Sequence, residues 1–332
     1  MTFQSRQLKE TASENLKKSQ NQHDILLVYA AAVLGLSCLN LVAQALVSKG
    51  ISQTGGLANM GSRSFLSAIS TFLPVLCTIV NLCLGFGYAG AMLRVSRGQY
   101  ASRNALRTGF ERFWPLVRTK LLLGLVYLGA GIGASYLSAI IFLLSPFSDG
   151  FEQLMAPLMG GSNLLTGTSQ LVLDDAAISA IMTAAGPLFV IFLVVVLAFV
   201  LPIVYKYRMV DYVLLDHPEA GALYALRESR MMMRGSRLGL FRLDLSFWWY
   251  YLLSLLVSAL AYGDVLLASL GVALPMGETA ASFLFYFLYL AAELALMYFL
   301  YNKVNVTYAL AYNQLKPKEE NSGVVLGNIF QM

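Results

Sequence analysis

Glu293 has the clearest capacity for chemistry in this sequence, because its carboxyl group lies inside an otherwise apolar run of residues, 279–301. Ionisable groups within membrane-spanning helices are costly, usually face the bundle interior and often serve proton or substrate pathways. Asn81 lies at comparable depth in another apolar run and could hydrogen-bond this carboxyl group. Two interpretations stay open: a functional carboxylate, or a protonated Glu293 that pairs structurally with Asn81, since burial favours the neutral form.

Asp244 is a second acidic residue in a chemically suggestive position, where a basic loop meets the apolar run that starts at Phe247. Arg237 and Arg242 are near in sequence and can form an ion pair with it. Such a pair would lock the loop to the inner mouth of a helix bundle. A binding or gating role is the alternative to this structural lock.

Two basic loops have the pattern of amphipathic helices. In the first, apolar side chains recur at helical spacing (Leu106, Phe110, Phe113, Trp114 and Val117), with arginines on other faces. Ser102 is the expected N-cap and Pro115 the expected end of this helix. The pattern predicts either an in-plane helix with its arginines at lipid phosphates or a helix docked on the underside of the bundle.

The second basic loop has the same amphipathic pattern, and we expect a helix from Pro218 to Gly235. The arginines of the two loops are the candidate contacts for lipid or a protein partner: Arg103, Arg107, Arg112, Arg230 and Arg234.

Recognised catalytic motifs are missing from the sequence. His23 and His217 stand in polar segments without metal-ligand spacing, and there is no P-loop, G-x-G-x-x-G or G-x-S-x-G pattern. The stretch Ala261–Val265 is similar to the G-x-G-D motif of intramembrane aspartyl proteases, but Ala261 replaces the first glycine and no second aspartate faces Asp264. We therefore expect no catalytic residue, no metal, no cofactor and no enzymatic activity.

Long apolar segments must position all of these residues. The chain has 332 residues, of which 58% are hydrophobic and 12% charged, about half the charge of an average soluble domain. Runs of about 20 apolar residues cross a bilayer as helices. We predict an all-α, polytopic bundle with two cytoplasmic in-plane amphipathic helices and six spans: Ile25–Val47, Phe65–Leu93, Lys120–Leu144, Ile178–Val204, Phe247–Val272 and Thr279–Tyr301.

The basic residues predict the orientation of the bundle. All but Lys49 and Arg63 of the 23 Lys and Arg residues fall in the two tails and in the second and fourth loops. The positive-inside rule then places both termini in the cytoplasm. The expected organisation is a cytoplasmic amphipathic lead-in (1–24), a six-span membrane domain (25–301) and a cytoplasmic tail (302–332). The net charge of +5 is explained by this topology, and no nucleic-acid partner is expected.

Gly129 and Gly133 form a G-x-x-x-G step in the third apolar run. Such a step lets helix backbones approach closely. It predicts packing within the bundle, with homo-oligomerisation as the alternative.

The fourth loop resembles a known family. Ser229, Met232 and Gly235 precede Leu-Phe-x-Leu-Asp-Leu-Ser-Phe at 240–247, and the opening residues 8–19, LKETASENLKKS, form a similar basic lead-in. These features resemble the bacterial integral-membrane proteins grouped as domain of unknown function 975. The resemblance implies a multi-span plasma-membrane protein and no established reaction.

Two function classes follow. The first is a non-enzymatic membrane protein that organises the plasma membrane or assists transport there, with its basic inner helices at anionic head groups or a protein partner. The second is a transporter or exporter of a small amphipathic solute or peptide, with Glu293 as the coupling carboxylate. An intramembrane enzyme would need two convergent polar residues at one depth, which the sequence does not offer.

Overall fold

The computed structural model describes residues 5–19, 21–53, 60–145, 186–219, 221–269 and 277–316, and within these ranges the regular structure is entirely helical. The chain divides into two compact units. Unit 1 combines residues 1–118 with 209–332, and unit 2 comprises residues 119–208. Each unit is described by itself.

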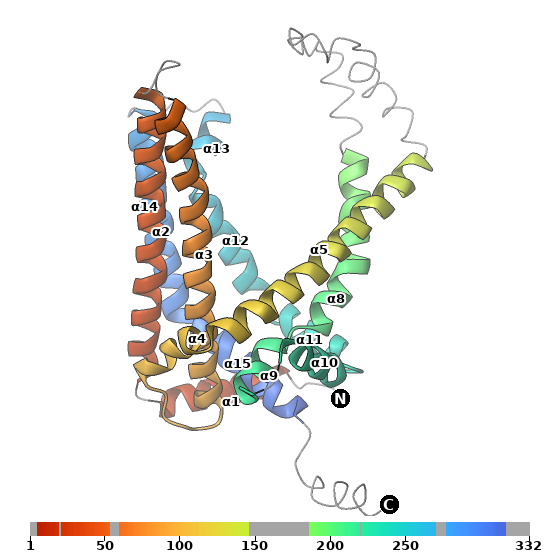
Figure 1. The fold of residues 1–332 in the computed structure, drawn as a ribbon. Coiled ribbons are helices and arrows are strands. Elements are labelled where there is room, and N and C mark those ends of the chain that lie inside the picture. Colours follow the sequence, from red (N-terminus) through yellow and green to blue (C-terminus); the bar gives the residue numbers. More distant parts are fainter. Residues whose placement is uncertain are drawn as a thin grey trace, which may run out of the picture. The chain divides into compact units, whose positions relative to one another are not determined.

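Unit 1 contains most of the helices drawn in Figure 1. Its N-terminal part comprises α1 (Ser5–Lys18), α2 (Gln22–Gln53), α3 (Met60–Ser96), the short 3-10 helix η2 (Arg103–Arg107), α4 (Thr108–Glu111) and the first turn of α5 (Phe113–Leu143). Its C-terminal part comprises α9 (Val210–Asp216), α10 (Ala222–Met232), α11 (Arg237–Leu245), α12 (Trp248–Leu260), α13 (Gly263–Ser269), α14 (Glu278–Leu296), the π-helical stretch η4 (Met297–Tyr301) and α15 (Asn302–Leu315).

Unit 2 consists of the rest of α5 and a second apolar helix. This second helix runs from residue 186, passes through the π-helical stretch η3 (Val196–Val200) and ends with α8 (Leu201–Lys206). A Cβ atom placed on Gly133 would lie 3.8 Å from the Phe199 ring. Gly133 therefore faces the second helix of its own unit, whereas a Cβ atom on Gly129 would meet nothing within 4 Å. Close packing of helix backbones at the G-x-x-x-G step stays a prediction.

Within the described ranges, five helices are long and apolar enough to cross a membrane: Gln22–Val47, Ser64–Ser96, Phe113–Leu143, Gly186–Asp216 and Ala280–Leu315. A sixth crossing exists if α11 and α12 are one broken span, since their axes bend by 60°. The fold is thus that of a multi-pass membrane protein. Residues 178–185 of the predicted fourth span and 270–272 of the fifth lie outside the described residues.

The best-packed core of unit 1 gathers the lead-in helix and the end of the chain. In α1, Leu8, Ala12 and Leu16 recur every four residues and are buried, so they form one face of the helix. Ala12 and Leu16 pack in the same cluster as Ile25 of α2, Met92 of α3 and Val306 of α15. The predicted amphipathic lead-in is therefore a helix docked on the bundle.

The first basic loop packs backbone to backbone on α3. A Cβ atom on Gly87 would lie 2.4 Å from the Leu106 carbonyl oxygen. Leu106 is buried, whereas Phe110 and Trp114 are exposed. Part of the predicted apolar stripe therefore packs on the bundle, and the rest faces away from it.

The expectation that Pro115 ends a helix is wrong: Pro115 lies in the first turn of α5, where its missing N–H leaves no hydrogen bond unmade. Ser102 is the N-cap residue of η2, as expected, although its side chain makes no capping hydrogen bond.

The second basic loop contains a helix that the sequence pattern did not predict, α9. The following helix, α10, starts at Ala222, so the prediction that Pro218 opens it is wrong. The backbone N–H of Met209 donates to Ser229 Oγ at 3.3 Å, which ties the start of α9 to α10. Gly235 adopts a left-handed φ of 83° shortly after α10, as a glycine that ends a helix does.

The helix of the predicted sixth span continues beyond Tyr301 to Leu315. Its last part, α15, has nine buried residues, among them Asn302, Thr307 and Tyr312. The first half of the predicted polar tail is therefore a packed helix of unit 1.

Candidate functional site

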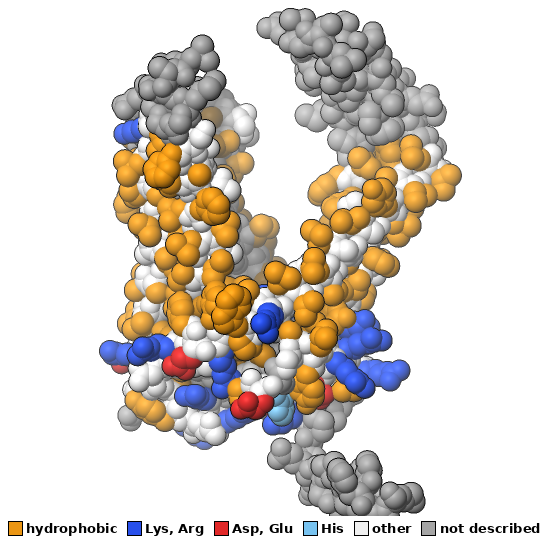
Figure 2. All heavy atoms as spheres, viewed as in Figure 1, with side chains coloured by type: hydrophobic (Ala, Val, Ile, Leu, Met, Phe, Trp, Pro, Cys, Tyr) orange, Lys and Arg blue, Asp and Glu red, His pale blue; other side chains and the backbone are white. Residues whose placement is uncertain are grey.

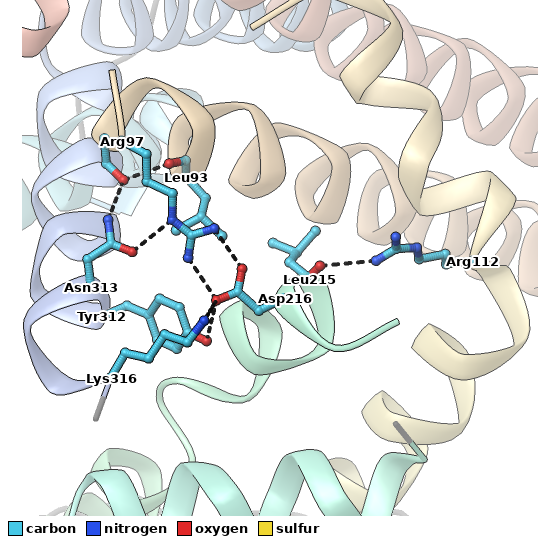
Figure 3. Close-up of polar contacts among 9 residues, drawn as sticks. Leu93, Arg97, Arg112, Leu215, Asp216, Tyr312, Asn313 and Lys316 are labelled. Atoms are coloured by element: carbon cyan, nitrogen blue, oxygen red, sulfur yellow. Dashed lines mark hydrogen bonds and ion pairs between the residues drawn. The ribbon is translucent and has the colours of Figure 1, made fainter. Parts of the chain in front are cut away.

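A bidentate ion pair joins Arg97 to Asp216 in unit 1 (Figure 3). The two guanidinium NH groups donate to the two carboxylate oxygens at 2.8 and 2.7 Å. Gly98, at φ 69°, turns the chain at the end of α3 and thereby fixes the direction in which Arg97 leaves the helix. The hydrogen bonds that Arg97 donates to Asp216 raise the pKa of Arg97 above its ordinary value. The Asp216 side chain is only 8% exposed and that of Arg97 is 31% exposed, so the carboxylate is shielded from water and the guanidinium group is partly exposed.

Residues of α15 complete the surroundings of Asp216. The Tyr312 hydroxyl donates to Asp216 Oδ2 at 2.9 Å, and Lys316 Nζ lies 3.4 Å from the same oxygen. Asn313 accepts from Arg97 Nε at 3.1 Å and donates to Ser96 Oγ at 2.9 Å. We call these six residues (Ser96, Arg97, Asp216, Tyr312, Asn313 and Lys316) the polar junction. It joins α3, α9 and α15 and balances the buried carboxylate with two cations.

A pocket of about 120 Å³ lies beside the polar junction, lined among others by Arg94, Arg97, Gln99, Thr108, Arg112 and Asp216. Arg112 donates from one guanidinium nitrogen to the Leu215 carbonyl oxygen at 3.2 Å, so it holds the last turn of α9 against the pocket. Arg94 is exposed, and its side chain makes no hydrogen bond or ion pair with other described residues. We call this cavity the arginine pocket.

Glu293 lies half-buried on α14 near a cluster of tyrosines. The rings of Tyr29 and Tyr88 stack at 4.5 Å between centroids, and Tyr301 lies 5.2 Å from Tyr88. The Tyr88 hydroxyl donates to the Asn302 side-chain oxygen. Glu293 interacts electrostatically with Tyr29, Tyr250, Tyr289 and Tyr301. The carboxyl group thus belongs to an aromatic, hydroxyl-rich environment.

Asn81, the predicted partner of Glu293, has a buried side-chain oxygen without a hydrogen-bond partner among the described residues. The pairing of Glu293 with Asn81 stays a prediction.

Asp244 accepts a hydrogen bond from the Tyr308 hydroxyl, which also lies 2.6 Å from the Tyr251 hydroxyl. This chain of polar contacts joins α11, α12 and α15. Arg237 is half-buried and its Nε has no partner in the described part of the chain, whereas Arg242 is exposed. The ion-pair lock predicted for Asp244 with Arg237 or Arg242 stays a prediction.

The five predicted lipid-contact arginines have different surroundings. Arg107, Arg230 and Arg234 are exposed. Arg103 is exposed too and forms an ion pair with Asp24 at 3.0 Å. Arg112 is half-buried in the wall of the arginine pocket. In Figure 2, basic side chains of unit 1 gather at the end of α2 and α3 that adjoins α1, and hydrophobic side chains cover the length of these helices.

Arg97, Asp216 and Tyr312 were not predicted from the sequence. A signal for Tyr312 existed, because Tyr308, Tyr312 and Lys316 recur every four residues in the predicted tail, which is typical of one helix face. Among the described residues, no group of three or more His, Cys, Asp and Glu side chains could hold a metal ion.

Comparison with curated proteins and with solved structures found no match. The model of one protein family matches residues 1–318, which is nearly the whole chain. The match includes the lead-in helix, the arginine pocket, the Asp244 segment and α15. The chain therefore belongs to the family described as "Protein of unknown function (DUF975)".

Proposed function

We propose that this protein is a non-enzymatic, multi-pass protein of the bacterial plasma membrane, with both termini in the cytoplasm. Its basic inner helices contact anionic lipid head groups, and through them the protein organises the membrane or assists transport there. The observation that carries the proposal is the exposure of Arg107, Arg230 and Arg234 on the two basic loops that flank apolar helices.

The neighbours of these arginines support a head-group location. Trp114, on the same loop as Arg107, is 66% exposed, and Phe110 is exposed as well. Aromatic rings are enriched at the membrane–water interface, and each Lys or Arg near an anionic surface contributes roughly 1 kcal/mol of attraction. Together, three such arginines should make the protein prefer anionic lipid strongly enough for the preference to be measured in a bilayer.

Spin-labelled lipids test this proposal on the full chain in phosphatidylcholine bilayers. The fraction of motionally restricted label measures the association of phosphatidylglycerol relative to phosphatidylcholine. We expect a severalfold preference for phosphatidylglycerol, reduced by 0.5 M NaCl because salt screens surface charge. The triple variant Arg107→Gln, Arg230→Gln, Arg234→Gln should lose most of the preference, and the matched triple lysine variant should keep it. An unchanged preference in the glutamine variant overturns the proposal.

A transporter that uses Glu293 is the second candidate. It is favoured by the half-buried carboxyl group among tyrosine hydroxyls and by the π-helical stretch that starts four residues later, at Met297. π-Helical turns occur frequently at functional sites. Proteoliposomes that contain a pH-sensitive dye measure proton uptake under a potassium diffusion potential. Glu293→Gln should abolish uptake and Glu111→Gln, an exposed carboxylate, should not. Equal uptake in both variants removes Glu293 from the mechanism.

A further inference from the structure

Among the described residues that line it, the arginine pocket has more cationic than anionic side chains. Asp216 contributes one carboxylate to the wall, and Arg97 and Lys316 already neutralise it. Arg94 and Arg112 add two further guanidinium groups to the same cavity. Because like charges in one cavity repel each other, an anion between them would be strongly attracted.

Side chains with hydrogen-bond donors line the cavity from two segments of the chain, the end of α3 and the region of α4. Arg94 lies in the last turn of α3 and Arg97 directly follows the helix, and both line the cavity. Gln99 follows in the next turn, and Thr108 and Arg112 come from the start and end of α4. Arginine forks match the geometry of phosphate oxygens, and amide and hydroxyl groups donate to further oxygens.

The size and charge of the pocket select the anion. A volume of about 120 Å³ equals that of about four water molecules in the liquid, which admits a tetrahedral phosphate group. A phosphate monoester, such as the head group of phosphatidic acid, or free phosphate carries up to two negative charges, which match the guanidinium groups of Arg94 and Arg112. A carboxylate or a phosphodiester carries only one.

We propose that the arginine pocket binds a single phosphate group, with Arg94 and Arg112 as its principal ligands. The phosphate belongs either to a lipid head group or to a free phosphate in solution. The pocket lies beside the last turns of α3, which contribute Gly90, Leu93 and Arg94 to its lining. Residues Ser64–Ser96 of this helix are apolar enough to span the membrane, so a phospholipid can present its phosphate at this depth. The lipid source rests on the proposed function, whereas phosphate recognition by the pocket does not.

Native mass spectrometry of the full chain in detergent tests the lipid source, with dioctanoyl phosphatidic acid and dioctanoylglycerol as probes. We expect a saturable one-to-one complex with the phosphatidic acid and none with the diglyceride. Calorimetric titration with inorganic phosphate tests the free source. If inorganic phosphate binds and phosphatidic acid does not, the pocket is a soluble-phosphate site and the lipid assignment is wrong.

Three variants locate the binding. Arg94→Gln should weaken the one-to-one complex at least tenfold, and Arg94→Lys, which keeps the charge, should weaken it less. Arg6→Gln removes an arginine of α1 that is 92% exposed and lies outside the pocket, and it should change the affinity less than twofold. Equal weakening by Arg94→Gln and Arg6→Gln overturns the pocket assignment, as does the lack of saturable binding by either phosphate probe.

The two proposals fail separately. If the pocket variants have no specific effect while the spin-label preference for phosphatidylglycerol persists, only the pocket assignment is wrong. If the complex forms and depends on Arg94 while the spin-label preference is missing, the pocket assignment holds and the proposed function is wrong.

Discussion

Gly109 lies against Cys83 so closely that a Cβ atom on the glycine would stand 1.9 Å from the Cys83 carbonyl oxygen. Together with the approach of Gly87 to Leu106, this contact fixes the first basic loop on α3 without intervening side chains. The walls of the arginine pocket depend on it, because Thr108 and Arg112 flank Gly109 in sequence.

Gly109→Ala should destabilise the protein, because the added methyl group must push the loop away from α3. We expect a loss of about 2–3 kcal/mol, seen as a lower unfolding temperature of the protein in detergent. Gly35→Ala is the matched control, since a Cβ atom there meets nothing within 4 Å; it should be neutral. A stable Gly109→Ala protein with unchanged unfolding would contradict the close packing.

Removing either member of the Arg97–Asp216 pair should be costly, because its partner is left partly buried without compensation. Asp216→Asn and Arg97→Gln should each lower stability by about 2–3 kcal/mol, and the double variant should cost less than the sum. The exposed pair Arg103–Asp24 is the control, where Arg103→Gln should cost below about 0.5 kcal/mol. Additive effects of Asp216→Asn and Arg97→Gln in chemical denaturation would show that the two side chains are not coupled.

Tyr88→Phe should remove the buried hydrogen bond to Asn302 and leave an amide oxygen without a donor. We expect a loss of about 1 kcal/mol, the usual size for polar contacts between membrane helices. Adding Asn302→Leu should restore part of the stability, because both polar groups are then gone. Thermal unfolding of the single and double variants measures this, and a double variant less stable than Tyr88→Phe would be the contrary result.

A charged substitution at Ala12, which is fully buried, should weaken the docking of α1 on the bundle. The same substitution at its exposed neighbour Thr11 should not. Ala12→Glu places a charge in the core and should release α1, so trypsin should cut after Lys17 and Lys18 faster than in Thr11→Glu. Cleavage in inside-out vesicles, with protection in right-side-out vesicles, is expected because the N-terminus is predicted to be cytoplasmic. Equal cleavage rates for both variants would show that α1 is not held by this face.

The number of crossings decides where the C-terminal end lies. Six spans return it to the cytoplasm and five place it outside, so the bent pair α11–α12 is the deciding element. A green fluorescent protein fused after Lys316 should fluoresce, and alkaline phosphatase at the same position should be inactive. Active phosphatase there would mean that α11 and α12 do not cross.

The membrane helices could be predicted from the sequence because their signal is local. The predicted first span, Ile25–Val47, ends where the apolar helix Gln22–Val47 ends, since a continuous apolar run needs no distant partner. The predicted fifth span starts at Phe247, next to the first residue of α12, but hydropathy does not reveal the 60° bend between α11 and α12 that comes just before it. That this segment crosses the membrane stays a prediction.

The polar junction could not be predicted because its members are far apart in the chain. Arg97 and Asp216 are separated by 119 residues, and Asp216 and Tyr312 by 96. Nothing in the local pattern around Arg97 distinguishes it from the other arginines of the first basic loop. The arginine pocket follows from the docking of the loop on α3, so it too required the tertiary structure.

The π-helical stretch Met297–Tyr301 changes the phase of the long C-terminal helix. An extra residue accommodated in one turn rotates everything after it by about 100° relative to an uninterrupted α-helix. A helical wheel drawn continuously through residues 280–315 would therefore assign Asn302, Tyr308 and Tyr312 to the wrong side. Deleting one residue from this turn would swing the three side chains away from Tyr88, Asp244 and Asp216 at once, so the membrane half and the polar half of the helix are held in register by a single irregular turn.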